Sequence, residues 1–262
     1  MNTGPIGIFD SGIGGTSIWK EIALALPQED TLYLADSKNA PYGEKSKEDI
    51  LQLSIKNTEW LLQRDCKLIV VACNTATTNA IDHLRKTFGV PFIGIEPAIK
   101  PAALGSRTKK VGVLATKGTL ASSLFHSTAQ LYASGIEVMV QEGKGLVELL
   151  ETGQLHSQEM EVLLKTYIDP MVASGMDYLV LGCTHYPYLV PKLQQLLPTT
   201  VTIMDSGSAV AKQTKKVLTA HRLLNPSAEA PQHEFYTNTQ VAILSSFLAD
   251  VNPPVVVRYL DF

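Results

Sequence analysis

Two cysteines in this sequence share a pattern that suits acid/base chemistry. Cys73 ends the apolar run of LIVVACNT and Cys183 ends that of YLVLGCTH, and a small polar pair follows each. A strand that leads into a helix N-terminus offers unpaired N–H groups and the positive end of the helix dipole, and both lower the pKa of a thiol. A lone cysteine at a strand end is more often a buried core residue. Two in equivalent places would flank a ligand bound between them, so we expect a pair of reactive thiols.

His185 is the residue best placed to set the protonation of one thiol, because it lies two positions after Cys183. A thiol pair with a histidine could also suggest a metal. Zinc sites, however, usually have four ligands, often in closely spaced pairs, and the sequence has no C-x₂-C. We therefore expect no metal site. Cys66 precedes its strand and has no counterpart in the second half of the chain, so we assign it no function.

The glycine-rich stretch FDSGIGG, Phe9 to Gly15, is expected to turn between a strand and a helix. Its backbone N–H groups could hold an anion, but it lacks the spacing of a dinucleotide fingerprint and the lysine of a P-loop. Asp10 would repel a phosphate. Asp10 and Ser11 could instead meet the ammonium of an amino acid while nearby N–H groups hold its α-carboxylate. The alternative is an ordinary tight turn in which Asp10 caps the helix.

Two further loops are expected at the same edge of their sheets as the cysteines. APYGEKS, residues 40–46, is a turn by composition, but Pro41, Tyr42 and Gly43 could line a cleft there. ATKGT, residues 115–119, is the second half's version of the Asp10 loop. The hydroxyls of Thr116 and Thr119 could bind an anion or merely cap a helix.

Short apolar runs rich in β-branched residues alternate with amphipathic stretches along most of the chain. Continuous apolar strands between helices indicate parallel sheets that are covered on both faces, which is an α/β fold. Ser46, with Asp49 three residues on, is expected to start a helix. Gly89 is expected to end the helix that follows Cys73. Glu148 and Glu151 of LVELLETG are expected on the solvated face of another helix.

An internal repeat relates the two halves of the chain. IGIFDSG resembles VGVLATKG at a shift of 105 residues, while LIVVACNT resembles YLVLGCTH and PFIGIEP resembles VTIMDSG at a shift of 110. The repeat predicts two pseudo-symmetric open α/β domains with parallel sheets. Ligand loops gather at the carboxyl ends of such strands, so we expect the active site in the interdomain cleft. We expect the tail PPVVVRYLDF to return to the first domain, giving domains of residues 1–97 plus 208–262 and of residues 98–207.

The composition indicates a globular protein of the cytoplasm. The chain has 262 residues, 45% of them hydrophobic, and a net charge of −3 with acids and bases interspersed. Nucleic-acid and membrane-surface proteins normally carry a concentrated basic patch, so we expect neither partner. We find no signal peptide and no apolar run of about 18 residues that could span a membrane. The three cysteines are expected to be reduced.

The motifs FDSGIGG, PYG, ACNTAT, GIEPA, ATKGT, LGCTHYP and MDSG, in this order between residues 6 and 207, resemble those of the cofactor-independent glutamate racemases of the aspartate/glutamate racemase family. The resemblance implies a homodimer that binds glutamate in its interdomain cleft, uses no cofactor and supplies D-glutamate for peptidoglycan. It implies that Cys73 and Cys183 are the catalytic acid/base pair, supported by Asp10 and His185. The implied lining residues are Asp10, Ser11, Tyr42, Gly43, Asn74, Thr75, Thr184 and His185, with Asp36 and Glu151 as weaker candidates.

Racemisation needs a base on one face of Cα and an acid on the other, and two thiols on opposed domains would supply both. Two other functions remain open. The same scaffold could racemise aspartate or another amino acid. It could also be a non-catalytic protein whose two lobes close on a small ligand, although binding alone would not need two thiols.

Overall fold

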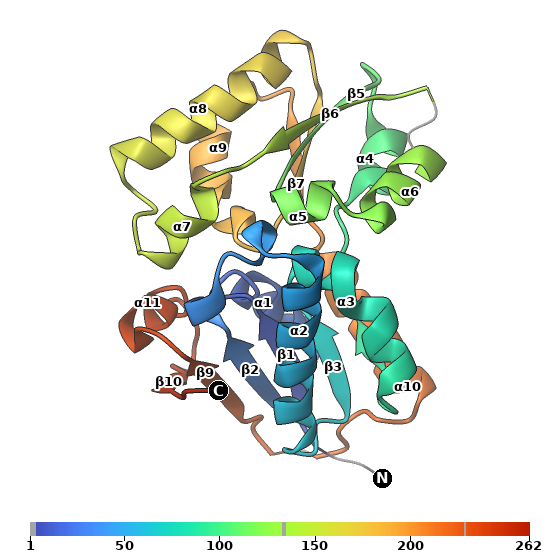
Figure 1. Cartoon of the computed structure of the whole chain (residues 1–262), viewed down its shortest axis with the longest axis vertical. Helices are drawn as coiled ribbons and strands as arrows, with labels where there is room; N and C mark the ends of the chain where they lie inside the picture. The colour runs from blue at the N-terminus through green and yellow to red at the C-terminus, as the bar shows by residue number, and fades with distance from the viewer. Residues whose placement is uncertain (1–3, 133–134, 228) are drawn as a thin grey trace.

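The computed structural model describes residues 4–132, 135–227 and 229–262, and it arranges them in two lobes, each built on its own sheet (Figure 1). We call the part around the six-stranded sheet the first lobe. Its elements are β1 (Ile6–Asp10), α1 (Thr16–Ala25), β2 (Thr31–Ala35), the 3₁₀ turns η1 (Ser37–Asn39) and η2 (Tyr42–Glu44), α2 (Lys47–Leu62), β3 (Leu68–Val71), α3 (Asn74–Thr87), β4 (Phe92–Ile93), α10 (Gly207–Ala220), β9 (His233–Thr237), α11 (Val241–Ser246) and β10 (Val256–Tyr259).

The second lobe surrounds a four-stranded sheet made by the middle of the chain. Its elements are α4 (Ile99–Gly105), β5 (Lys110–Ala115), α5 (Lys117–Leu120), α6 (Ser123–Tyr132), β6 (Glu137–Glu142), α7 (Leu146–Glu151), α8 (Gln158–Ala173), β7 (Tyr178–Gly182), the 3₁₀ turn η3 (Tyr186–Leu189), α9 (Val190–Leu196) and β8 (Thr202–Met204).

The two sheets repeat one strand order, as the sequence repeat predicts. The first sheet runs β10-β9-β2-β1-β3-β4 and the second runs β6-β5-β7-β8. The repeated segments therefore occupy equivalent places, with β5 matching β1, β7 matching β3 and β8 matching β4. The strands of both sheets pair in parallel throughout the described residues, which confirms the predicted fold class. Because parallel strands end at one edge, the loops after β1 and β3 lie together, as do those after β5 and β7.

Alternate residues of each strand enter opposite layers of the core. In the first lobe, Ile8 and Val70 face α1 and α10, whereas Phe9 and Val71 face α2 and α3. In the second lobe, one sheet face packs on α7, α8 and α9 and the other on α4 and α6. Burying both faces accounts for the continuous apolar strands in the sequence.

The C-terminal tail adds β9 and β10 to the first sheet, beside β2. The expected boundary after residue 97 lies just before α4, and the one after residue 207 lies within the first turn of α10. Those boundaries stay predictions, and residues 1–3 of the first predicted domain lie outside the described residues.

The sequence predicts where α2 begins and where α3 ends. The predicted start of α2 is confirmed, because the Ser46 hydroxyl accepts a hydrogen bond from the Asp49 amide at 3.1 Å. The expected end of α3 before Gly89 is met to within one residue, since Phe88 is the C-cap residue, but the glycine does not cap the helix. The helix ends at Thr87, Phe88 is already extended, and Gly89 does not adopt the left-handed conformation. Phe88 instead leaves the helix to pack against Phe92, with ring centroids 6.2 Å apart.

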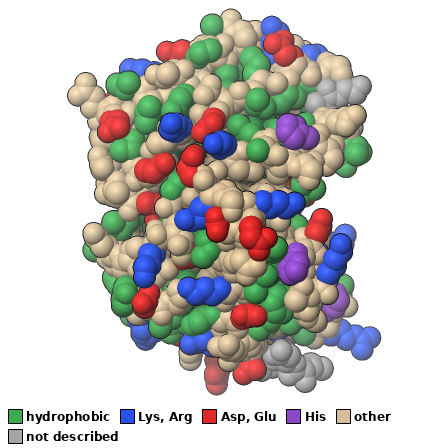
Figure 2. Space-filling model, in the orientation of Figure 1, with side chains coloured by type: hydrophobic (Ala, Val, Ile, Leu, Met, Phe, Trp, Pro, Cys, Tyr) green, Lys and Arg blue, Asp and Glu red, His purple; other side chains and the backbone are tan. Residues whose placement is uncertain are grey.

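The surface in Figure 2 carries acidic and basic side chains of both lobes, intermixed. Within the described ranges, no helix is long and apolar enough to cross a membrane.

Candidate active site

Both cysteines of the repeat lie where a strand gives way to a helical turn, and they line one cavity between the lobes. Cys73 follows β3 and is the N-cap residue of α3, and Cys183 follows β7 just before η3. Each is almost fully buried, with 4% and 6% of its surface exposed. The parallel sheets thus bring two thiols, 110 residues apart in the sequence, to one site.

Cys73 is buried, and its surroundings favour the protonated thiol. The Ala76 amide donates to its Sγ at 3.4 Å, and the thiol donates to Ser11 Oγ at 3.6 Å. Burial nevertheless raises the pKa of Cys73 to about 12, and the negative charge of Asp10 adds to the rise. The expectation that the helix N-terminus would lower this pKa is therefore wrong, because loss of solvation outweighs the helix contacts.

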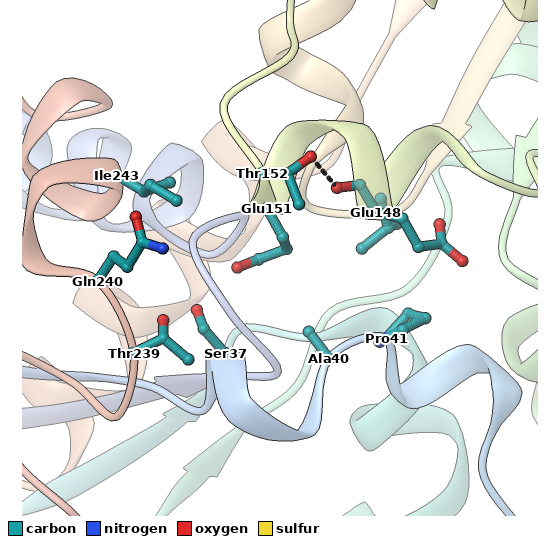
Figure 3. Close-up of a pocket in the computed structure, with 10 residues that line it drawn as sticks. Ser37, Ala40, Pro41, Glu148, Glu151, Thr152, Thr239, Gln240 and Ile243 are labelled. Carbon is teal, nitrogen blue, oxygen red and sulfur yellow. Dashed lines mark hydrogen bonds between the residues drawn. The ribbon is translucent and has the colours of Figure 1, made fainter.

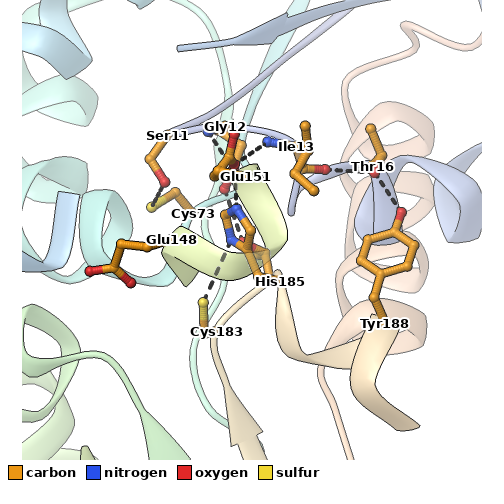
Figure 4. A network of polar contacts seen from close by, with 12 residues as sticks. Ser11, Gly12, Ile13, Thr16, Cys73, Glu148, Glu151, Cys183, His185 and Tyr188 are labelled. Atoms are coloured by element: carbon orange, nitrogen blue, oxygen red, sulfur yellow. Dashed lines mark hydrogen bonds and ion pairs between the residues drawn. The ribbon is translucent and has the colours of Figure 1, made fainter. Parts of the chain in front are cut away.

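Cys183 lies beside a buried histidine, His185. Its Sγ lies 3.7 Å from His185 Nδ1, and His185 Nε2 lies 2.5 Å from Glu151 Oε1 (Figure 4). Burial lowers the pKa of His185, but its contacts with Cys183 and Glu151 outweigh that effect and raise it well above the usual value. In its protonated form, His185 would stabilise a negative charge that developed within this contact distance.

Glu151 does not lie on a solvated face as expected, although Glu148 is exposed. Its side chain is 10% exposed, and its Oε1 accepts a hydrogen bond from the Ile13 amide of the first lobe at 2.7 Å as well as contacting His185. The reason is that α7 ends at Glu151, so this side chain reaches past the helix end and across the interface. Only the family resemblance pointed to it, because helical periodicity places it beside Glu148.

Asp10 is fully buried and does not cap α1, whose N-cap residue is Gly15. Its Oδ1 accepts from the Gly12 amide at 2.9 Å, and its Oδ2 accepts from the Thr184 hydroxyl of the second lobe at 3.0 Å. Burial raises the pKa of Asp10 to about 6, against a lowering by His185. The helix-cap alternative for this motif is thus wrong, and the carboxylate joins the two lobes.

The other predicted residues lie around the thiols. Four of the predicted site residues do not line the thiol cavity: Asp10, Thr119 and the weaker candidates Asp36 and Glu151. The others do, namely Ser11, Pro41, Tyr42, Gly43, Cys73, Asn74, Thr75, Thr116, Cys183, Thr184 and His185. Thr119 is fully buried behind Thr75, whose hydroxyl oxygen lies 3.4 Å away. Val147 of α7 is a wall residue that sequence reasoning missed, because nothing distinguishes it from a core valine.

Asn74 has an amide with unmet hydrogen-bonding capacity. The residue is 3% exposed, and within the described part of the chain neither its Nδ2 nor its Oδ1 has a hydrogen-bond partner. An unpaired buried amide is costly, on the order of 1–3 kcal/mol. Since Asn74 lines the cavity, this amide suits a ligand with both a donor and an acceptor, as an amino acid has.

The lobes are closed on each other around this site. Thr75 of α3 and Thr116 before α5 share a hydrogen bond of 2.8 Å, and the Ser17 hydroxyl of α1 donates to the Thr184 carbonyl at 2.8 Å. The cavity between the thiols is only about 10 Å³, close to what one water molecule needs. An amino acid can therefore reach the thiols only when the lobes separate.

A larger cavity of about 380 Å³ opens beside the thiol site (Figure 3). Its walls come from both lobes: Ser37, Ala40 and Pro41 on one side, Glu148, Glu151 and Thr152 on the other, with Thr239, Gln240 and Ile243 of the tail completing the rim. Pro41 lines both cavities. Across the described residues, no group of three or more His, Cys, Asp or Glu side chains could hold a metal ion.

Comparison with known proteins gives one consistent family. The profile of the Asp/Glu/hydantoin racemase family matches residues 9–214. A glutamate racemase of Herpetosiphon aurantiacus is 44% identical over 238 residues, which are 91% of this chain and 94% of that protein. A glutamate racemase isoform of Bacillus anthracis has a similar structure, with a TM-score of 0.88 and 28% identity over 100% of this chain and 98% of that one.

A second solved structure adds a bound amino acid to the comparison. The Escherichia coli glutamate racemase, solved with L-glutamate and the activator UDP-MurNAc-Ala, has a TM-score of 0.85 and 32% identity, and the match covers 97% of each chain.

Proposed function

The chain belongs to the Asp/Glu/hydantoin racemase family, and we propose that it interconverts L-glutamate and D-glutamate through Cys73 and Cys183, without a cofactor. It is an isomerase of the glutamate racemase kind, similar to such enzymes over nine-tenths of its length. One observation carries the two-thiol mechanism. The thiols meet in one cavity in unlike surroundings: burial raises the pKa of Cys73 to about 12, whereas Cys183 lies 3.7 Å from His185, whose pKa is raised well above its usual value.

The reaction needs one thiolate and one thiol on opposite faces of Cα. In one direction Cys183, as thiolate, takes the Cα proton, and Cys73 gives its own proton to the other face. The Cα–H bond breaks on one side and a new one forms on the other, so Cys183 ends as thiol and Cys73 as thiolate. The reverse reaction uses the same groups in exchanged roles. A positioned general base contributes about 10²–10⁴-fold in rate.

The carbanion-like intermediate places negative charge next to the α-carboxylate, where hydrogen-bond donors stabilise it. Asn74, Thr75 and Thr184 supply such donors, and the unpaired amide of Asn74 supports this assignment. Asp10 and Ser11 meet the ammonium. His185, held by Glu151, balances the charge that forms on Cys183.

The biological setting is proposed from the family resemblance. The D-glutamate product serves peptidoglycan synthesis, and the protein works in the cytoplasm as a homodimer with no nucleic-acid or membrane partner. Its domains comprise residues 1–97 with 208–262 and residues 98–207, a division that the chain segments of the two sheets support.

The test is to incubate the purified protein with single enantiomers of glutamate and of aspartate and to resolve the products by chiral chromatography. We expect both glutamate enantiomers to racemise and both aspartate enantiomers to persist. Racemisation of aspartate alone would move the activity to another acidic amino acid. Thermal stabilisation by glutamate without any racemisation would instead favour a non-catalytic binding protein.

A further inference from the structure

A buried polar network behind the Tyr42 side of the thiol cavity has no part in the proton transfers above. Its centre is Asp36, which follows β2 and is 1% exposed. Asp36 Oδ2 accepts a hydrogen bond from the Tyr42 hydroxyl at 2.6 Å. Its Oδ1 accepts from Asn39 Nδ2 at 2.8 Å and from Asn238 Nδ2 at 2.6 Å. Hydrogen bonds to a charged group are the stronger ones, so this network is a firm attachment.

Asn238 is the member that comes from furthest away in the sequence. It lies between β9 and α11 in the tail and is 4% exposed. While its Nδ2 donates to Asp36, its Oδ1 accepts from the Lys38 amide at 2.8 Å. One side-chain amide thus holds the start of the 36–43 segment at two points.

The segment held in this way forms part of the thiol cavity. Tyr42 is 1% exposed, and Pro41, Tyr42 and Gly43 line the cavity with Cys73. The Tyr42 hydroxyl donates to Asp36 and accepts from Asn57 Nδ2 at 3.1 Å. Two anchors therefore fix the ring, one through Asn238 and Asp36 and one on α2.

We propose that Asn238 is a positioning residue that fixes the Pro41–Gly43 wall against Cys73 by holding Asp36 and Lys38. Its effect on catalysis rests on the proposed racemase function, but its effect on the cavity does not. Losing it removes one of the two anchors of the 36–43 segment, while the bond from Asn57 to Tyr42 remains. The wall then covers Cys73 less tightly and holds the substrate less precisely in its reacting position. A role confined to stability would change neither property of the folded protein.

The experiment compares Asn238→Ala with Thr237→Val as a matched control. Thr237 lies in the same tail, is 1% exposed, and bonds within the tail to Thr239 at 3.3 Å. We expect both variants to melt at lower temperature. For Asn238→Ala alone, kcat/KM falls roughly ten- to a hundredfold, as expected for a lost hydrogen bond to a charged group.

Alkylation by iodoacetamide, followed by peptide mass spectrometry, gives a readout that needs no enzyme activity. We expect Cys73 to react several-fold faster in Asn238→Ala than in the wild type or in Thr237→Val. Wild-type alkylation and wild-type kcat/KM in Asn238→Ala, despite a lower melting temperature, would overturn the proposal. If the wild type fails to racemise glutamate, the alkylation rates still decide whether Asn238 positions the wall.

Asn238→Asp keeps the side-chain volume and the acceptor for the Lys38 amide, so it serves if the alanine variant does not fold. The substitution places a second carboxyl group against that of Asp36, which in the wild type faces the Tyr42 hydroxyl and two side-chain amides. The Lys38 ammonium does not offset this charge, because it pairs with Asp261 at 3.2 Å. Two adjacent carboxyl groups are both protonated at low pH, hold one proton between them at intermediate pH and repel each other once both are ionised. Cys73 alkylation should therefore quicken as the pH rises, relative to the wild type. An unchanged ratio of the two rates across pH would contradict the proposal.

Discussion

At the scale of single residues, the buried charge of Asp10 lowers the stability of the folded protein. This carboxyl is fully buried between the lobes, and burial raises its pKa from 3.8 to about 6. Above pH 6 this buried carboxyl group is ionised in the folded protein, which lowers the free energy of unfolding by roughly 3 kcal/mol. The cost disappears once the carboxyl is protonated in both the folded and the unfolded state, below pH 3.8. We propose that Asp10 is kept for what its charge does, which in the proposed reaction is to meet the substrate ammonium.

Asp10→Asn should therefore stabilise the protein while removing its activity. The neutral amide avoids the cost of ionisation, so urea unfolding at pH 8 should show a gain of about 2–3 kcal/mol over the wild type, shrinking by about half at pH 5. Glutamate racemisation should fall at the same time. A variant that is less stable than the wild type at pH 8 would show that the carboxylate contributes net stability.

At the scale of elements, the glycine-rich turn between β1 and α1 packs closely against side chains of the second lobe. A Cβ on Gly12 would lie 1.8 Å from Glu151 Oε1, and one on Gly14 would lie 2.2 Å from His185 Nδ1. Neither glycine has the left-handed conformation, so the need for glycine here is close approach rather than backbone freedom. The turn also supplies the Ile13 amide to Glu151, so closure of the lobes and placement of His185 are coupled.

Gly14→Ala tests that coupling. The added methyl group cannot coexist with the present position of His185, so the lobes close incompletely and kcat/KM should fall by roughly 10²-fold. Gly89→Ala is the matched control, since a Cβ there meets no atom within 4 Å and its φ is also outside the left-handed region. Steady-state kinetics of both variants check this, and equal kcat/KM values for the two would contradict it.

At the scale of the whole molecule, duplication explains how two distant thiols share one site. The β1, β3 and β4 segments of the first sheet have counterparts in β5, β7 and β8 of the second, and the loops after these strands face each other. The closed cavity of about 10 Å³ is too small for glutamate, so turnover requires separation of the lobes. In the proposed mechanism, closure also excludes water from the intermediate.

The parts of this arrangement that could be predicted from the sequence are those with a local or repeated signal. The apolar strands and the Ser46 cap predict the elements of the fold. The repeat at a shift of 110 residues predicts that Cys73 and Cys183 lie in one site. Glu151 and Asn238 could not be found in this way, because their partners lie in other segments and their own surroundings in the sequence are ordinary. The raised pKa of Cys73 could not be predicted for a related reason, since it comes mainly from burial, which is a property of the tertiary structure.

The central claim is that two thiols from opposite lobes carry out the proton transfers, and deuterium uptake at Cα in D₂O tests it most directly. Each glutamate enantiomer is incubated with the wild type, Cys73→Ala, Cys183→Ala and Cys66→Ala, and both product chirality and Cα deuterium are measured. In the wild type we expect the newly formed enantiomer to carry deuterium from the start. Each of the two site variants should lose racemisation while keeping its fold by circular dichroism, and each should exchange at most one enantiomer. Cys66→Ala should behave as the wild type. Undiminished racemisation by either Cys73→Ala or Cys183→Ala would contradict the two-thiol mechanism.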